Sequence, residues 1–256
     1  MAVIDAADFA AMAMAMSRED AQRDELIKRS RDVLKLSKNA VYALHRGDAA
    51  RAAGMIAEAK AIAARDLLPL VAAAPSLRGG ALSAALEEWA EAAIFAAFVA
   101  GRPLPTIGEL EIVTREEYLG GVMDFTGELG RYAVLRATAR DGAGVERCRD
   151  VCDALFEQFL SFEWRNGGLR RKFDAVKYTV KKVEQIIYEL SLAGAGVTVA
   201  PKSSPEADGV PGEGHREGGA ADGGDDAEEE EQEAAPAGGG GDGGGARRGR
   251  RGPRRK

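Results

Sequence analysis

Two pairs of acidic residues have types and spacings that could support chemistry. Glu88 and Glu91 are three positions apart, and Asp124 and Glu128 are four positions apart. At about 100° per residue, the two members of each pair lie on the same face of a helix. Two carboxylates one turn apart on a partly covered face repel each other unless a cation or a base lies between them. If the two helices are antiparallel neighbours, all four acids can meet.

This set of ligands favours a hard divalent cation. Four carboxylate groups without a histidine suit Mg²⁺ or Mn²⁺ better than zinc or copper. Such an ion lowers the pKa of a bound water and offsets the charge of a phosphate, while one carboxylate can act as general base. The two histidines, His45 and His215, are too few for the paired Glu-x-x-His motifs of a di-iron bundle, and they give a histidine-based triad little to work with. The expected chemistry is therefore carboxylate and metal chemistry.

The neighbours of the first pair indicate partial burial. Phe95 and Phe98 continue the stripe of Glu88 and Glu91 at helical spacing, so this stripe is expected to face protein. Glu87 points elsewhere and is interpreted as ordinary surface.

The neighbours of the second pair leave two interpretations open. Gly120 and Gly121 come one turn before Asp124, and their lack of side-chain bulk would let a ligand approach closely. Arg131 could instead neutralise Glu128 as a salt bridge across three positions on a solvated face. Spacing alone is compatible with either a metal site or simple charge pairing.

Helices must position these residues. From residue 1 to about 195 nearly every window has a 3.6-residue period, and turns rich in Gly and Pro separate the helical stretches. Long helices with short connections predict an all-α antiparallel bundle of about six or seven long helices. The expected helices span residues 4–46 (either continuous or broken around Ser17), 48–73, 80–100, 114–139, 144–164 and 168–192.

The last expected helix carries a regular apolar seam over three heptads. Such a seam is either intramolecular core or an interface with a partner helix. The basic residues around it, including Lys177, Lys181 and Lys182, form either a solvated face or a strip that faces RNA. The seam consists of Leu169, Phe173, Val176, Val180, Val183, Ile187 and Leu190.

Composition divides the chain into a helical domain, residues 1–195, and a tail, residues 196–256. Of the 32 glycines, 16 lie in residues 201–256, which contain almost no large apolar side chain, so this tail is expected to be disordered. Its acidic run, residues 225–233, precedes a basic end. This end is either a nonspecific phosphate-binding arm or a solubilising tail. Its candidate phosphate contacts are Arg247, Arg248, Arg250 and Arg251.

Other features exclude several classes of protein. The formal net charge is −6, of which residues 201–256 contribute −4, so the charge of the helical domain does not indicate a partner. No segment approaches the roughly 20 apolar residues of a membrane span, and no basic region precedes the weakly apolar Ala10–Met16 as in a signal peptide. Cys148 and Cys152, without a CxxC motif, fit a reducing compartment. A cytoplasmic protein without membrane contact is expected.

Three segments resemble the translin family. Gly120–Arg131, GGVMDFTGELGR, is similar to the family segment GVxDxTGELxR. Phe173–Ser191, FDAVKYTVKKVEQIIYELS, resembles its C-terminal pattern FDxLKYxVKKVExxxYxLS. Glu87–Ala92, EEWAEA, is similar to the EYVEA stretch of translin-associated factor X, the catalytic branch. The resemblance covers roughly residues 17–195, and the tail has no recognised counterpart.

The resemblance implies an all-α protein that assembles into a hollow, octamer-like shell and binds RNA or single-stranded DNA. The catalytic branch is a metal-dependent endoribonuclease, whose acidic residues carry over to Glu88, Glu91, Asp124 and Glu128. Because all four acids are present, the chain looks like this catalytic branch. The segment that links the two acidic helices is short here, which favours a compact homo-oligomer without a separate translin partner.

Three hypotheses follow from the sequence. The first is an endoribonuclease that uses Mg²⁺ or Mn²⁺ on small or single-stranded RNA, with all four acids in the site and Asp124 either holding metal or activating water. The second is a nucleic-acid-binding oligomer without catalysis, in which Arg131 or Arg136 neutralises the carboxylates. The third is an interaction scaffold that uses the heptad helix and the tail. Candidate nucleic-acid contacts in the helical domain are Arg131, Lys177, Lys181 and Lys182.

Overall fold

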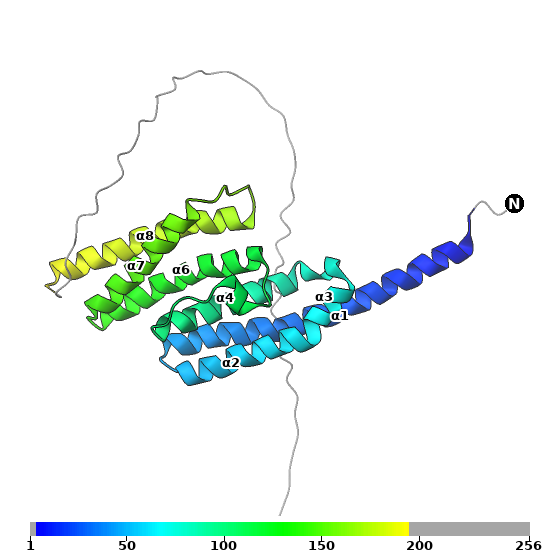
Figure 1. Ribbon diagram of the computed structural model, residues 1–256, viewed down its shortest axis with the longest axis horizontal. Helices are drawn as coiled ribbons and strands as arrows, with labels where there is room; N and C mark the ends of the chain where they lie inside the picture. Colours follow the sequence, from blue (N-terminus) through cyan, green and yellow to red (C-terminus); the bar gives the residue numbers. More distant parts are fainter. Residues whose placement is uncertain (1–3, 195–256) are drawn as a thin grey trace, which may run out of the picture. The chain divides into compact units, whose positions relative to one another are not determined.

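The structure is a computed structural model that describes residues 4–194 of the chain. Six long helices dominate this part, and it contains no strand, so the all-α prediction is confirmed (Figure 1). The tail predicted to be disordered lies outside the described residues. The long helices are α1 (Ala6–His45), α2 (Ala49–Ile62), α4 (Ala81–Val99), α6 (Arg115–Thr138), α7 (Gly142–Phe159) and α8 (Gly168–Leu192).

Short elements connect these helices. The helix α1 runs unbroken through Ser17, which is one of the two expected alternatives. The helix expected over residues 48–73 is interrupted by a π-helical turn, Ala63–Leu67, before it continues as α3, Leu68–Ala73. A 3₁₀ turn, Pro75–Arg78, leads into α4, and α5, Ile107–Leu110, precedes α6. No helix within residues 4–194 is long and apolar enough to cross a membrane.

The long helices pack side by side in a series. The helix α1 lies between α2 and α4, α4 packs against α6, and α6 packs against both α7 and α8 (Figure 1). Aromatic side chains fill the junction of α4 and α6, where the Phe98 and Phe125 rings lie 5.7 Å apart and Phe95 is also fully buried. This core fixes α4 and α6, the two helices that carry the acidic pairs.

Two glycines set the close approach of α4 and α6. A Cβ atom on Gly121 would lie 2.8 Å from the Glu87 carbonyl oxygen and 3.0 Å from the Glu91 backbone nitrogen. A Cβ atom on Gly120 would overlap the Glu87 carboxyl group. The expectation that these glycines make room for a ligand is therefore wrong, because the space beside them is filled by α4 itself.

A buried ion pair fixes the start of α6. Thr114 and Glu117 form a capping box, and Arg78 donates to the Glu117 carboxylate at 2.6 and 3.2 Å. Arg78 also donates to the carbonyl oxygen of Ile112 at 2.9 Å. Because Glu117 is only 1% exposed, these bonds are needed to offset the loss of its hydration.

The apolar seam of α8 is mainly intramolecular core. Phe173, Val176, Val183 and Ile187 are buried, and the remaining seam residues are partly buried against the same core. The helix α8 lies against α6 and α7 through this seam (Figure 1). Of the two interpretations of the seam, the structure therefore supports the packing within one chain.

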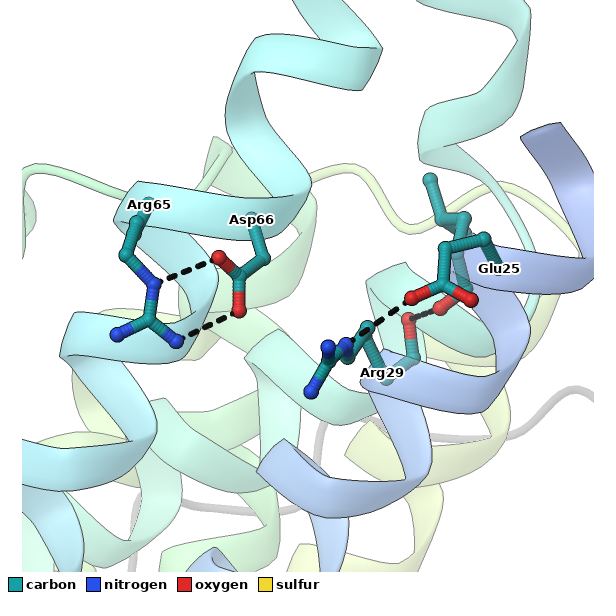
Figure 2. A network of polar contacts seen from close by, with 6 residues as sticks. Glu25, Arg29, Arg65 and Asp66 are labelled. Atoms are coloured by element: carbon teal, nitrogen blue, oxygen red, sulfur yellow. Dashed lines mark hydrogen bonds and ion pairs between the residues drawn. The ribbon is translucent and has the colours of Figure 1, made fainter.

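The N-terminal half of α1 has no packing partner among the described residues. Every side chain of residues 4–25 is exposed, and Leu26 is the first buried residue of the helix. Figure 2 shows the polar contacts near this point, where Arg29 donates to Glu25 at 3.1 Å and Arg65 donates to Asp66 at 2.7 and 2.8 Å. The hydrogen bond from Arg65 lowers the pKa of Asp66, and the charge of Arg29 adds to this effect. The body of the bundle thus begins at Leu26.

Candidate active site

One cavity collects the four acids that the sequence singled out. It has a volume of about 580 Å³ and is lined by residues of α1, α4, α6 and α8. Glu88 and Glu91 face it from α4, and Asp124 and Glu128 face it from α6. The predicted meeting of the two acidic pairs at neighbouring helices is therefore found.

Glu91 is the most perturbed of these acids. It is 6% exposed, and its pKa is raised to about 8, mainly by burial and then by the negative charges of Glu88, Asp124 and Glu128. Lys172 opposes the shift but does not cancel it. Burial of the Glu91 carboxyl beside three further acids therefore favours either a bound proton or a bound cation at this position.

Glu88 lies nearer the mouth of the cavity. Its side chain is 22% exposed, and Nζ of Lys38 on α1 lies 4.0 Å from one of its carboxylate oxygens. Burial raises the pKa of Glu88, and the charge of Lys38 acts in the opposite direction. The predicted burial of the stripe that ends in Phe95 and Phe98 is confirmed, since both rings are buried and both acids are shielded.

Glu128 is held by two nitrogen-bearing side chains. Nε2 of His45 lies 2.5 Å from one carboxylate oxygen, and Arg131 lies 3.0 Å from the other. The predicted Arg131 salt bridge is therefore present, but Glu128 is only 10% exposed rather than on a solvated face. Because a carboxylate only accepts hydrogen bonds, the His45 ring nitrogen is the donor. The His45 ring also packs on Phe95 at 4.8 Å.

The sequence interpretation assigns His45 no role in the site. One histidine outside the tail is too few for histidine-based catalysis. A signal was available, since Lys38, Val41 and His45 recur at helical spacing and all line the cavity. The sequence thus places Lys38 and His45 on one face of this helix, but it does not show which helix that face meets.

Asp124 and Glu87 share the ammonium group of Lys172. Lys172 donates to Asp124, and it lies 2.6 Å from a Glu87 carboxylate oxygen. Burial disfavours the charged form of Lys172, but the two hydrogen bonds outweigh this effect and its pKa is raised. The interpretation of Glu87 as ordinary surface is wrong, because its side chain is only 23% exposed and burial raises its pKa.

Apart from Arg131, the predicted cationic residues of the helical domain do not line the cavity. Arg136 lies 3.7 Å from Asp141 and over the Tyr132 ring, so its expected pairing with the acids is wrong. Lys177 pairs with Asp174 at 3.2 Å. Lys181 and Lys182 are exposed on α8 outside the cavity lining, whereas Arg131 lines it and is 72% exposed. The predicted contacts Arg247, Arg248, Arg250 and Arg251 lie outside the described residues.

The acidic side chains of the cavity are of the kind that binds a hard cation. Their present arrangement, however, does not form a metal site. Carboxylate oxygens are the ligands that Mg²⁺ and Mn²⁺ prefer. Within residues 4–194, however, no three Asp, Glu, His or Cys side chains converge closely enough to hold a metal ion. The contacts explain why, since Lys172 holds Asp124 while His45 and Arg131 hold Glu128. Glu88 and Glu91 are therefore the acids that remain most available to coordinate a metal ion.

The fold and cavity define an all-α bundle protein with an acidic cavity lined by four helices. The family model of the Translin family matches residues 21–194, which is more than half of the sequence, and the chain belongs to this family. Translin from Gallus gallus is 38% identical over 79 residues, which cover 31% of this chain and 34% of that protein. Translin from Homo sapiens is 37% identical over 79 residues, covering 31% and 35%. The match thus spans about a third of the length of these curated relatives.

Solved structures show the same fold. Apo-NeC3PO has a TM-score of 0.66 at 22% identity, and the match covers 74% of this chain and 100% of that chain. A complex of AfC3PO with duplex RNA has a TM-score of 0.63 at 21% identity, covering 74% and 99%. At these identities the likeness establishes the architecture of the bundle.

Proposed function

We propose that this protein is a metal-dependent endoribonuclease of the catalytic, translin-associated factor X type. The observation that carries this proposal is the acidic cavity, where Glu91 has a pKa raised to about 8 among three further acids. Mg²⁺ or Mn²⁺, when bound, would supply an activated water and offset charge on the scissile phosphate. The AfC3PO complex with duplex RNA supports RNA as the ligand of a protein with this fold.

Each residue of the cavity would have a role in metal or RNA binding that follows from its position. Glu88 and Glu91 would hold the cation from α4, and Asp124 and Glu128 would hold it from α6. His45 would orient Glu128 through its hydrogen bond. Lys172, which now donates to Asp124, would release this carboxylate and lie close to the negative charge of an RNA phosphate. Arg131, at the exposed edge of the cavity, would contact the backbone of the RNA.

The proposal is tested by RNA cleavage with matched variants. The wild type is expected to cut a labelled single-stranded RNA with Mn²⁺ and to stop in EDTA. Glu91→Gln and Asp124→Asn are expected to lose about a hundredfold or more of this activity. Glu116→Gln, which changes an exposed acid on the same helix as Asp124, is expected to keep it. Undiminished cleavage in EDTA, or by Glu91→Gln, would reject the metal mechanism.

A measurement of metal binding separates loss of the ion from loss of chemistry. Because a ligand that binds only the folded state stabilises it, Mn²⁺ is expected to raise the Tm of the wild type at pH 8. Glu91→Gln should show a smaller increase, and Glu116→Gln the full increase. An equal increase in all three proteins would place the ion elsewhere.

The second candidate is an oligomer that binds RNA or single-stranded DNA without catalysis. It is favoured by the ion pairs of Lys172 with Asp124 and of Arg131 with Glu128, and by the hydrogen bond between His45 and Glu128. In this case the same preparations would bind the oligonucleotide without cutting it. The assembly proposed for either candidate is a homo-oligomer, with the octamer-like shell of the family resemblance as its expected form.

The basic end of the tail can be tested independently. Deletion of residues 201–256 should weaken RNA binding more at low salt than at high salt if this end contacts phosphates. An unchanged slope of affinity against salt would leave the tail as a solubilising segment.

A further inference from the structure

Tyr42 is an exposed aromatic side chain at the acidic cavity. It lies in the last turn of α1, near the connection to α2, and its exposed fraction is 63% (Figure 1). The Tyr42 side chain lines the acidic cavity together with His45 and Arg131. An aromatic ring that stays open to solvent offers a flat surface on which a nucleic-acid base can stack.

A second, smaller hollow adjoins the acidic cavity at Tyr42. It has a volume of about 320 Å³ and is formed by the end of α1 and the start of α2. On α1, Lys38 and His45 line the acidic cavity, whereas Asn39 and Arg46 line the smaller hollow. At about 100° per residue Tyr42 lies between these two faces of the helix, and it is the one residue that lines both spaces. The lining of the smaller hollow consists of Asn39, Tyr42, Ala43, Arg46, Asp48 and Arg51.

The charge of this smaller hollow is positive, unlike that of the acidic cavity. Two guanidinium groups, those of Arg46 and Arg51, line it against the single carboxylate of Asp48. Asp48 caps α2, since its carboxylate accepts a hydrogen bond from the backbone N–H of Arg51 at 3.1 Å. Among the described residues neither guanidinium forms an ion pair. Both are exposed and therefore available to a phosphate group.

Arg46 also contacts the Tyr42 side chain itself. Its Nη1 atom donates to the Tyr42 hydroxyl oxygen at 3.2 Å, and its Cζ atom lies 5.6 Å from the centre of the ring. These two contacts restrict the ring without covering it, because Tyr42 remains 63% exposed. An aromatic face and a guanidinium group held side by side are the combination that binds a base together with its phosphate.

From these observations we propose that the smaller hollow is a nucleotide subsite beside the acidic cavity. An unpaired RNA base stacks on the Tyr42 ring, and the phosphate of the same nucleotide contacts Arg46 and Arg51. The strand then continues past Tyr42 into the acidic cavity. This inference rests on the proposed function, because it takes the RNA of that cavity as the ligand. Since a base within a duplex is already stacked and paired, the subsite requires an unpaired nucleotide next to the phosphate that is cut.

The first experiment measures the affinity of the full chain for a fluorescent single-stranded RNA in EDTA, by fluorescence anisotropy. Tyr42→Leu keeps an apolar side chain but removes the aromatic face, and is expected to raise the Kd about tenfold. Tyr42→Phe keeps the face and should stay within about twofold of the wild type. Tyr188→Leu, which removes an exposed ring of α8 outside both spaces, should leave the Kd unchanged.

The phosphate contacts are tested by the dependence of this affinity on salt. Each lost contact with a single strand lowers the slope of log affinity against log salt by about 0.7. Arg51→Gln is expected to show this decrease, whereas Arg23→Gln, an exposed change on α1 outside the hollow, should keep the slope of the wild type. Equal slopes for Arg51→Gln and the wild type would remove the phosphate from the hollow.

Stacking has a signature of its own. A uridine-rich RNA with one 2-aminopurine should lose fluorescence on binding when this base lies on Tyr42, and Tyr42→Leu should abolish the loss while Tyr42→Phe retains it. Equal fluorescence with the wild type and Tyr42→Leu, or no RNA binding at all, overturns the subsite. Added Mn²⁺ separates the two proposals: cleavage without a Tyr42 effect keeps the nuclease and rejects the subsite, whereas stacking without cleavage does the reverse.

Discussion

Nε2 of His45 lies 2.5 Å from Oε2 of Glu128, although 83 residues separate them in the chain. This contact joins the end of α1 to the middle of α6 across the acidic cavity. The contact holds Glu128, the acid that also pairs with Arg131, in a fixed orientation. A helix that the sequence interpretation used only as scaffold therefore supplies part of the candidate active site.

Replacing His45 should therefore affect both stability and metal binding. His45→Leu leaves a buried carboxylate without this donor and is expected to lower the free energy of unfolding by about 1–3 kcal/mol. His45→Gln can still place an N–H near Glu128 and should lose less than half as much. Urea denaturation at pH 7 checks the difference, and Mn²⁺ affinity should follow the same order. Equal losses in both variants would show that the ring packing on Phe95, rather than the hydrogen bond, matters.

The raised pKa of Glu91 predicts a pH-dependent stability. With a pKa near 4.5 in the unfolded chain and about 8 in the folded one, the folded state binds the extra proton between these values. The stabilising contribution is complete below pH 4.5 and is lost as the pH rises through about 8, at up to about 1.4 kcal/mol per pH unit. Glu91→Gln removes this titration, so the variant should become more stable than the wild type by roughly 2–4 kcal/mol near pH 8.

Denaturation of both proteins from pH 5 to pH 9, without divalent ions, checks this expectation. The exposed variant Glu116→Gln is the control and should follow the wild type at every pH. A constant difference between Glu91→Gln and the wild type over this range would contradict the pKa shift.

Lys172 should matter more at high pH than at low pH. Its single positive charge contacts both Glu87 and Asp124, and its loss leaves two half-shielded carboxylates without this cation. Lys172→Met is expected to cost about 1–3 kcal/mol at pH 8, and less near pH 4.5, where protonation relieves the repulsion. Lys181→Met, an exposed change on the same helix, serves as control in the same denaturation series. A pH-independent loss would assign Lys172 a packing role only.

Two glycines of α6 form a matched pair for testing the helix approach. Gly121→Ala would place a methyl group 2.8 Å from the Glu87 carbonyl oxygen and is expected to destabilise the fold by about 1–3 kcal/mol. An added Cβ on Gly127 meets nothing within 4 Å, so Gly127→Ala should stabilise the helix by about 0.4–1 kcal/mol. Thermal unfolding compares the two. Similar effects at both positions would mean that α4 and α6 are not in close contact.

The sequence predicted the helices and the acidic pairs well because both depend on local spacing. The burial of Phe95 and Phe98 and the shared face of Glu88 and Glu91 follow from one helical period. Their convergence with Asp124 followed from assuming that adjacent helices are neighbours.

The partners of the acids could not be obtained in this way. Lys172 and His45 reach the cavity from helices far away in the chain, and their positions depend on how α1 and α8 pack on α4 and α6. Gly120 and Gly121 look alike whether they face a ligand or a neighbouring helix. Only the packed structure distinguishes these cases.

Both cysteine thiols of the protein are unreactive at neutral pH. Cys148 and Cys152 are buried in α7 as free thiols, and burial raises the pKa of each to about 12. At neutral pH only about one thiol in a hundred thousand is then ionised, and thiolate is the form that reacts with maleimides or oxidants. A spin label or fluorophore can therefore be attached to a single engineered surface cysteine without first removing the native ones, which makes distances between copies directly measurable in the otherwise unaltered chain.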